Sequence, residues 1–210
     1  AVSGALVAAL VIGSAGASNL SARTTASSGN RVDAGLSRGK LDRAVAQAEK
    51  AVAAKPADAA LRLALGHAYL AAGRFESAAV TFDDAVKLGD ESGPTALSLA
   101  LALTASGQQQ TALGVLQDWR DVIPASDLGL AFALVGEPGR GVAILTDTLR
   151  GGENTAKVRQ NLAYAYALEG RWREARLMAS QDVPADQIDD RIGTWAMTVR
   201  PEATQARVAS

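Results

Sequence analysis

Two stretches of the chain repeat one another. "LGHAYLAAGRFESA" (residues 65–78) and "LAYAYALEGRWREA" (residues 162–175) carry Leu, Ala, Tyr, Gly, Arg and Ala at the same offsets. Agreement in position, and not only in composition, indicates a structural unit that the chain uses more than once. The two stretches hold almost no chemically reactive side chains, so the repetition predicts an architecture before it predicts any chemistry.

A glycine recurs in one local setting along the chain, at Gly39, Gly73, Gly107, Gly136 and Gly170. The successive spacings are 34, 34, 29 and 34 residues. The residue five positions after each glycine is always small: Ala44, Ala78, Ala112, Gly141 and Ala175. A small side chain at that place lets two helices approach closely, so each glycine is predicted to mark the turn of a helical hairpin.

A period of 34 residues built as helix, turn and helix is that of tetratricopeptide repeats. Residues 59–92 resemble this family most closely, with the family's residue types at Leu65, Gly66, Tyr69, Gly73, Ala78, Phe82 and Ala85. The resemblance implies an all-α fold, a right-handed tetratricopeptide superhelix (α-solenoid) of helix-turn-helix repeats with a C-terminal capping helix.

The resemblance places the solenoid at residues 31–183, with about five repeat units. The first unit is atypical because its opening stretch, "NRVDAGLS" (residues 30–37), has few large apolar residues. The fourth is atypical because it is five residues short and has Pro138 at the start of its second helix, a place that tolerates proline. Residues 184–210 are predicted to form the capping helix and a tail, since Ile188, Ile192, Trp195 and Val199 share one helical face.

The N-terminal segment, residues 1–22, resembles a secretory signal peptide. It has no charge before Arg23, an apolar run at residues 5–12 and the small-residue pattern "AGA" at residues 15–17. Residues 23–30 are predicted to be a linker. We therefore expect an exported bacterial protein located in the periplasm. An uncleaved anchor and a flexible Ala-rich tail are the alternatives, and membrane association is expected only if the segment is uncleaved.

The composition argues against several classes of function. Lys and Arg number 21 and Asp and Glu number 22, so no basic field attracts nucleic acid. The chain has no cysteine and one histidine, His67, which leaves no thiolate zinc site, no cysteine nucleophile and no two-histidine metal site. We predict no catalytic residues, no metal, no cofactor and no small-molecule substrate, and hence no enzyme.

The resemblance implies that the first helix of each repeat lines a concave groove that binds peptides. Transferred by offset from the turn glycines, the groove positions are Leu63, His67, Leu70, Leu97, Leu101, Thr104, Leu130, Lys157, Gln160, Asn161 and Tyr164. The leucines favour an apolar or amphipathic helical ligand, and the polar end from Lys157 to Tyr164 would fix its direction. Tyr164 and Gln160 are expected to be accessible. The alternative is that some of the leucines pack between repeats.

Two hypotheses for function follow. The first is a non-enzymatic scaffold or adaptor in the bacterial cell envelope that binds a protein or peptide partner. Within that class the chain looks like the exported repeat proteins of tight-adherence (Flp-type) pilus assembly. The second is a structural spacer of a larger envelope protein that carries a peptidoglycan-binding module beyond residue 210.

Overall fold

The computed structural model describes residues 26–199, with side chains from residue 39. The expected signal segment lies outside the described residues, as does the end of the tail. Every regular element of the described chain is a helix: α1 (Ala26–Ala54), α2 (Ala59–Ala71), α3 (Phe75–Lys87), α4 (Gly93–Ala105), α5 (Gln109–Asp118), α6 (Ala125–Val135), α7 (Pro138–Arg150), α8 (Ala156–Leu168), α9 (Trp172–Ala179) and α10 (Ile188–Thr198).

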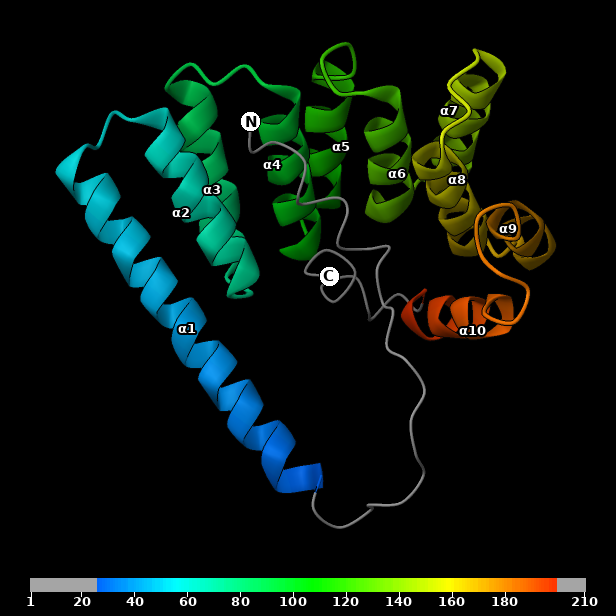
Figure 1. Cartoon of the computed structure of the whole chain (residues 1–210). Helices are drawn as coiled ribbons and strands as arrows, with labels where there is room; N and C mark the ends of the chain where they lie inside the picture. Colours follow the sequence, from blue (N-terminus) through cyan, green and yellow to red (C-terminus); the bar gives the residue numbers. More distant parts are fainter. Residues whose placement is uncertain (1–25, 200–210) are drawn as a thin grey trace.

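Four helix pairs follow one another in an arc: α2 with α3, α4 with α5, α6 with α7, and α8 with α9 (Figure 1). Each second helix also packs on the first helix of the next pair, α3 on α4, α5 on α6 and α7 on α8. Helices α1 and α10 lie at the two ends of the arc. The predicted all-α solenoid of helical hairpins is confirmed.

The glycine turn within each pair has the backbone conformation that glycine favours. The φ angles are +71° at Gly73, +84° at Gly107, +110° at Gly136 and +79° at Gly170. A side chain at positive φ would clash with its own backbone, whereas glycine adopts this conformation at little cost. The turns predicted at these four glycines are confirmed.

The turn predicted at Gly39 is wrong. Gly39 lies inside α1, which runs without interruption from Ala26 to Ala54, through part of the expected linker. Ala44, the small residue expected between two helices, is exposed because no hairpin partner covers it. "NRVDAGLS" (residues 30–37) offers few large apolar side chains to bury in a hairpin, so the continuous helix is the better way to satisfy the backbone hydrogen bonds. The first unit therefore contributes one helix instead of a pair.

Small residues set the separation of the two helices in each pair. Ala78, Ala112 and Ala175 are fully buried. Gly66 on α2 faces the ring of Phe82 on α3 so closely that an added Cβ would lie 2.6 Å from a ring carbon. Protein interiors are close-packed, so there is no free volume at these contacts to accept a larger side chain.

The shorter spacing between Gly107 and Gly136 is accommodated by shorter helices. Helix α5 has 10 residues and α6 has 11, whereas α2, α3 and α4 have 13 each. Pro138 stands in the first turn of α7, as predicted. The α6–α7 pair is unusually close, because a Cβ at Gly141 would collide with the carbonyl oxygen of Gly129. Glycine at both positions thus allows the compressed pair to form.

Two arginines at equivalent repeat positions fasten their helix pairs. Arg62 on α2 contacts Asp84 on α3 at 2.5 Å and donates to the carbonyl oxygen of Pro56. Arg159 on α8 contacts Asp182 after α9 and donates to the carbonyl oxygen of Asn154. Each guanidinium joins the loop before the first helix to the end of the second, which fixes the hairpin at the edge opposite its glycine turn.

Replacing Ala78 with Leu is expected to destabilise the best-formed pair, because the added atoms have no space between α2 and α3. Overpacking of this kind costs about 1–3 kcal/mol. Denaturant unfolding of the Ala78→Leu protein and its parent measures the loss. The control is Ala143→Leu, at an exposed position of α7, which should change the free energy of unfolding little. An unchanged free energy of unfolding for Ala78→Leu would show that the helix register is wrong.

Candidate functional site: the inner surface of the arc

The first helices of the pairs lie on the inner side of the arc. Helix α4 contacts α6 and α6 contacts α8, in addition to the contacts within each pair. Eleven residues of α4 and nine of α6 are buried, against two of α5 and three of α7. Inner helices of a curved stack are the most crowded, so α4, α6 and α8 form the inner layer, and α2 has the equivalent place in the first pair.

One side chain from each first helix forms a row along this layer, six residues before each turn glycine. We name this set the inner row: His67, Leu101, Leu130 and Tyr164. His67 and Leu101 are half-buried, whereas Leu130 is 4% exposed and Tyr164 is 6% exposed. The row is therefore accessible at the α2 and α4 end and covered at the α6 and α8 end.

The remaining apolar candidates divide between surface and interior. Leu63 is half-buried, and it packs against a buried cluster that includes Leu70 and Leu97. Thr104 is 1% exposed, and its hydroxyl donates to the carbonyl oxygen of Ala100 at 2.7 Å. Leu70, Leu97 and Thr104 thus pack within the helix layers, and Leu63 remains partly accessible.

His67 stands against an aromatic ring. Its imidazole meets Phe82 edge-on, with the ring centroids 5.0 Å apart. Burial lowers the pKa of His67 below its ordinary value of 6.5, because the charged form loses hydration that the protein does not replace. Among the described residues, no hydrogen-bond partner reaches the buried Nδ1 atom. The neutral imidazole therefore contributes to an apolar surface.

The polar candidates on α8 are engaged with α6. Lys157 Nζ lies 2.6 Å from a carboxylate oxygen of Asp127, and the Asn161 side-chain amide donates to the carbonyl oxygen of Ser126 at 2.9 Å. Asn161 is 4% exposed, and the Lys157 side chain is about half exposed. These groups fix α8 against α6. Gln160, which is half-buried, is the remaining polar candidate at this end.

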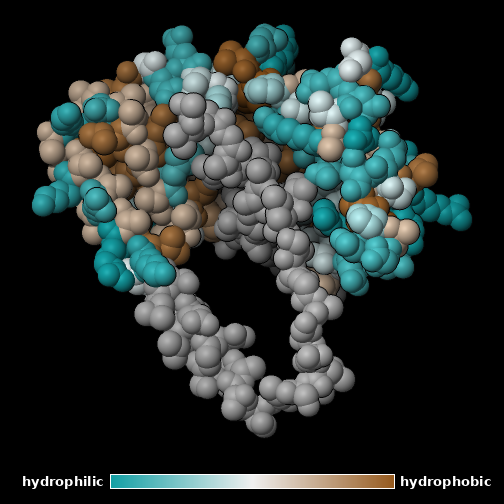
Figure 2. All heavy atoms as spheres, viewed as in Figure 1, coloured by the Kyte–Doolittle hydropathy of each residue, from teal (hydrophilic) through white to brown (hydrophobic). Residues whose placement is uncertain are grey.

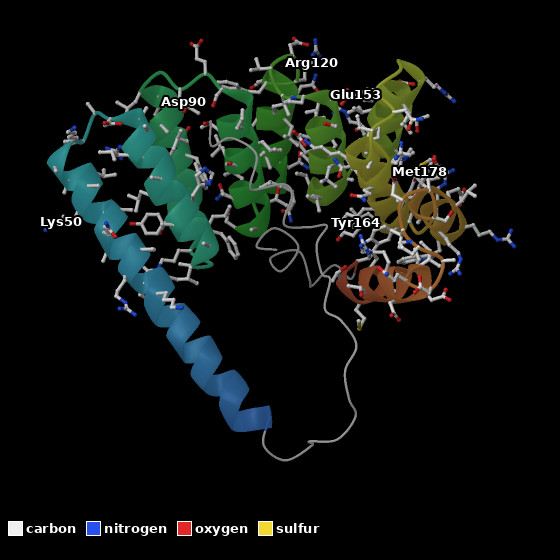
Figure 3. The ribbon with its side chains drawn as sticks, viewed as in Figure 1. Lys50, Asp90, Arg120, Glu153, Tyr164 and Met178 are labelled. Carbon is white, nitrogen blue, oxygen red and sulfur yellow. The ribbon has the colours of Figure 1, made fainter. Side chains whose placement is uncertain are left out.

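Tyr164 does not stand open to solvent, although the sequence suggested that it would. Its ring lies 5.5 Å, centroid to centroid, from that of Trp195 on α10, with 59° between the planes. Figure 3 shows Tyr164 beside α10. The sequence showed the apolar face of α10 but not its docking place, because no local pattern links residues about thirty positions apart.

The space-filling view shows where apolar side chains gather on one face. Hydrophobic residues are concentrated over the α2 to α4 end, whereas the α7 to α10 end is mainly hydrophilic (Figure 2).

Within residues 26–199, no group of three or more His, Cys, Asp or Glu could hold a metal ion. None of the helices in the same range is long and apolar enough to cross a bilayer. The geometry is suited to contact with an apolar surface.

Comparison with known families agrees with this arrangement. A tetratricopeptide repeat model matches residues 36–103, which extend from α1 into α4. The described chain has the tetratricopeptide repeat fold. No curated protein sequence matches the chain.

Several solved structures resemble this chain over most of its length. The thermophilic protein TTC0263 from Thermus thermophilus has a TM-score of 0.56 at 25% identity, covering 76% of this chain and 92% of that one. MamA has a TM-score of 0.53 at 22% identity, covering 74% and 92%. YrrB, described as a tetratricopeptide protein with an unusual peptide-binding site, has a TM-score of 0.52 at 20% identity, covering 74% and 84%. Likeness at such identities establishes the fold alone.

The stability of the tetratricopeptide fold is expected to depend on pH through His67. Its pKa is lower in the folded chain than in the unfolded chain, so the unfolded state binds more protons between the two values. The free energy of unfolding should therefore fall as the pH drops from about 7 to about 5. In the His67→Gln protein this part of the pH dependence should disappear. Urea unfolding of both proteins across this range checks it, and identical slopes would contradict the burial of a neutral imidazole.

Proposed function

We propose that the chain is a non-enzymatic adaptor whose inner surface binds an amphipathic helix of a partner protein. The observation that carries the proposal is the apolar, partly accessible end of the inner surface, formed by Leu63, His67 and Leu101 on successive first helices. Side chains from different repeats that share one surface can contact a ligand along several of its turns. The peptide-binding site in the description of YrrB gives further support, since that protein has a similar fold.

The chemistry of this surface indicates an apolar face on the ligand. Leu63 and Leu101 offer branched aliphatic groups, and the neutral imidazole of His67 lies one turn after Leu63 on α2. A helix with apolar residues at spacings of three and four would bury that face here and leave its polar face in water. Gln160 and the Lys157–Asp127 pair, at the far end, would contact the polar part of a longer ligand.

Selection of peptides from a displayed library tests this proposal. Peptides enriched on the parent protein should be amphipathic helices, and Leu63→Lys should weaken their binding at least about tenfold by placing a charge in the apolar contact. The matched control is Val80→Lys, because Val80 is 63% exposed on α3, the outer helix of the same pair. Fluorescence anisotropy gives the dissociation constants. Equal loss of affinity in both variants, or in neither, would refute binding at the inner surface.

We further propose that the adaptor acts in the bacterial cell envelope, in the assembly of a surface structure such as a tight-adherence pilus. The support is the signal-like pattern of residues 1–22, with its apolar run and small-residue motif. Export of a folded interaction module without cysteine is compatible with an oxidising compartment, since no thiol is available for unwanted pairing.

Fractionation of cells that make the chain from its own gene tests the location. The protein should appear in the periplasmic fraction, with its N-terminus after Ala17, because the "AGA" pattern precedes that point. Val7→Asp, which interrupts the apolar run, should keep the protein inside the cytoplasm with the segment intact. N-terminal sequencing makes the distinction. Parent protein found in the cytoplasm with residues 1–17 attached would contradict export.

A further inference from the structure

Helix α10 presents an apolar face to the rest of the chain. Ile188 is 5% exposed and Trp195 is 8% exposed, and Ile192 and Val199 are half-buried beside them. The opposite face is polar or open, and Met197 on that side is 68% exposed. Helix α10 is thus an amphipathic helix bound to the solenoid by one face.

The place where α10 binds includes the inner surface. One apolar cluster includes Trp195 of α10 together with Tyr164 and Leu130, with Leu101 packed against it, and the ring of Trp195 contacts that of Tyr164 directly. Tyr164, Leu130 and Leu101 are the inner-row residues of three successive helix pairs. The backbone of α10 lies closest to α9 and α8, the two helices of the last pair, and its Trp195 ring reaches Tyr164 on α8. In Figure 1, α10 lies below α8 and α9 and runs crosswise to α8.

We propose that α10 is an intramolecular occupant of the inner surface at its α8 end, where Trp195 covers Tyr164, and that a partner's helix must displace it to bind there. The inference rests on the proposed function, because it names the competitor at that same surface. It accounts for the burial of Tyr164, the inner-row side chain that Trp195 contacts.

The contacts that hold α10 are few enough to be displaced. Its charged contact with the solenoid is the Arg176–Asp189 ion pair, whose side chains are 49% and 77% exposed; pairs so exposed to solvent contribute little to stability. The helix has 11 residues, a length that is only marginally helical in isolation. Docking therefore depends on the apolar face, above all on Trp195.

The sequence of α10 also indicates what the partner helix resembles. Its apolar residues recur at spacings of four, three and four, with an aromatic ring against Tyr164. Its first turn carries Asp189 and Asp190, and Asp189 meets Arg176. A competing segment would be an amphipathic helix with an aromatic residue in its apolar face and an acidic first turn.

A labelled synthetic peptide of residues 183–199 is the probe, added to the full chain. The Trp195→Ala protein should bind it at least about fivefold more tightly than the parent, because weaker docking of its own α10 raises the fraction of open surface. The control is Met197→Ala, which alters the exposed side of the same helix and should bind like the parent. Adding Tyr164→Ala to Trp195→Ala should abolish the gain. Equal affinities of the parent and Trp195→Ala, or no binding by either, would overturn the proposal.

Hydrogen exchange provides a readout that does not depend on a variant. Amides of α10 in the parent should exchange faster than those of α8, and faster still with saturating probe; no change on adding the probe would overturn the proposal. A dimer that Trp195→Ala converts to monomer would also overturn it, because α10 would then bind a second copy. If library-selected peptides bind at Leu63 while Trp195→Ala changes nothing, the adaptor function stands and the competition alone fails.

Discussion

The close approach of two helices across each glycine turn is the constraint on which the rest of the structure depends. The residue five positions after the turn glycine is small, and this lets the second helix of a pair lie directly against the first. Ala78 and Ala112 are fully buried at this contact, and Gly141 takes the same place in the shortened pair. Because the pairs are nearly alike, they stack with a regular offset, and a regular offset produces an arc with an inner and an outer layer.

The inner layer acquires its binding chemistry from that geometry. Its helices are crowded on three sides by their partners and neighbours, so most of their residues are committed to packing. Positions such as His67 and Leu101 remain partly accessible and follow one another from pair to pair. The same crowding removes water from His67, which lowers the pKa of its imidazole and keeps the surface uncharged at neutral pH. The accessible positions that remain carry an aliphatic side chain at Leu101 and a neutral imidazole at His67, so the inner surface is apolar.

The sequence predicted those features that depend on local periodicity. Four of the turn glycines and the small residues opposite them could be located because each hairpin is determined by residues close together in the chain. The turn at Gly39 was wrong, since a matching glycine does not make a hairpin when the preceding stretch has little to bury. The partnerships of Lys157 with Asp127 and of Asn161 with Ser126 join residues about thirty positions apart, and no periodic pattern reports them. The docking of Trp195 on Tyr164 was hidden for the same reason.

The central claim is that the inner row is accessible at His67 and covered by α10 at Tyr164. The chain has no cysteine, so a single introduced thiol reports the accessibility of its own position. Rates of labelling should be high for His67→Cys and low for Tyr164→Cys, and the rate for Tyr164→Cys should rise when Trp195→Ala is added. Equal rates at the two positions, or a slow Tyr164→Cys rate that Trp195→Ala leaves unchanged, would contradict the account.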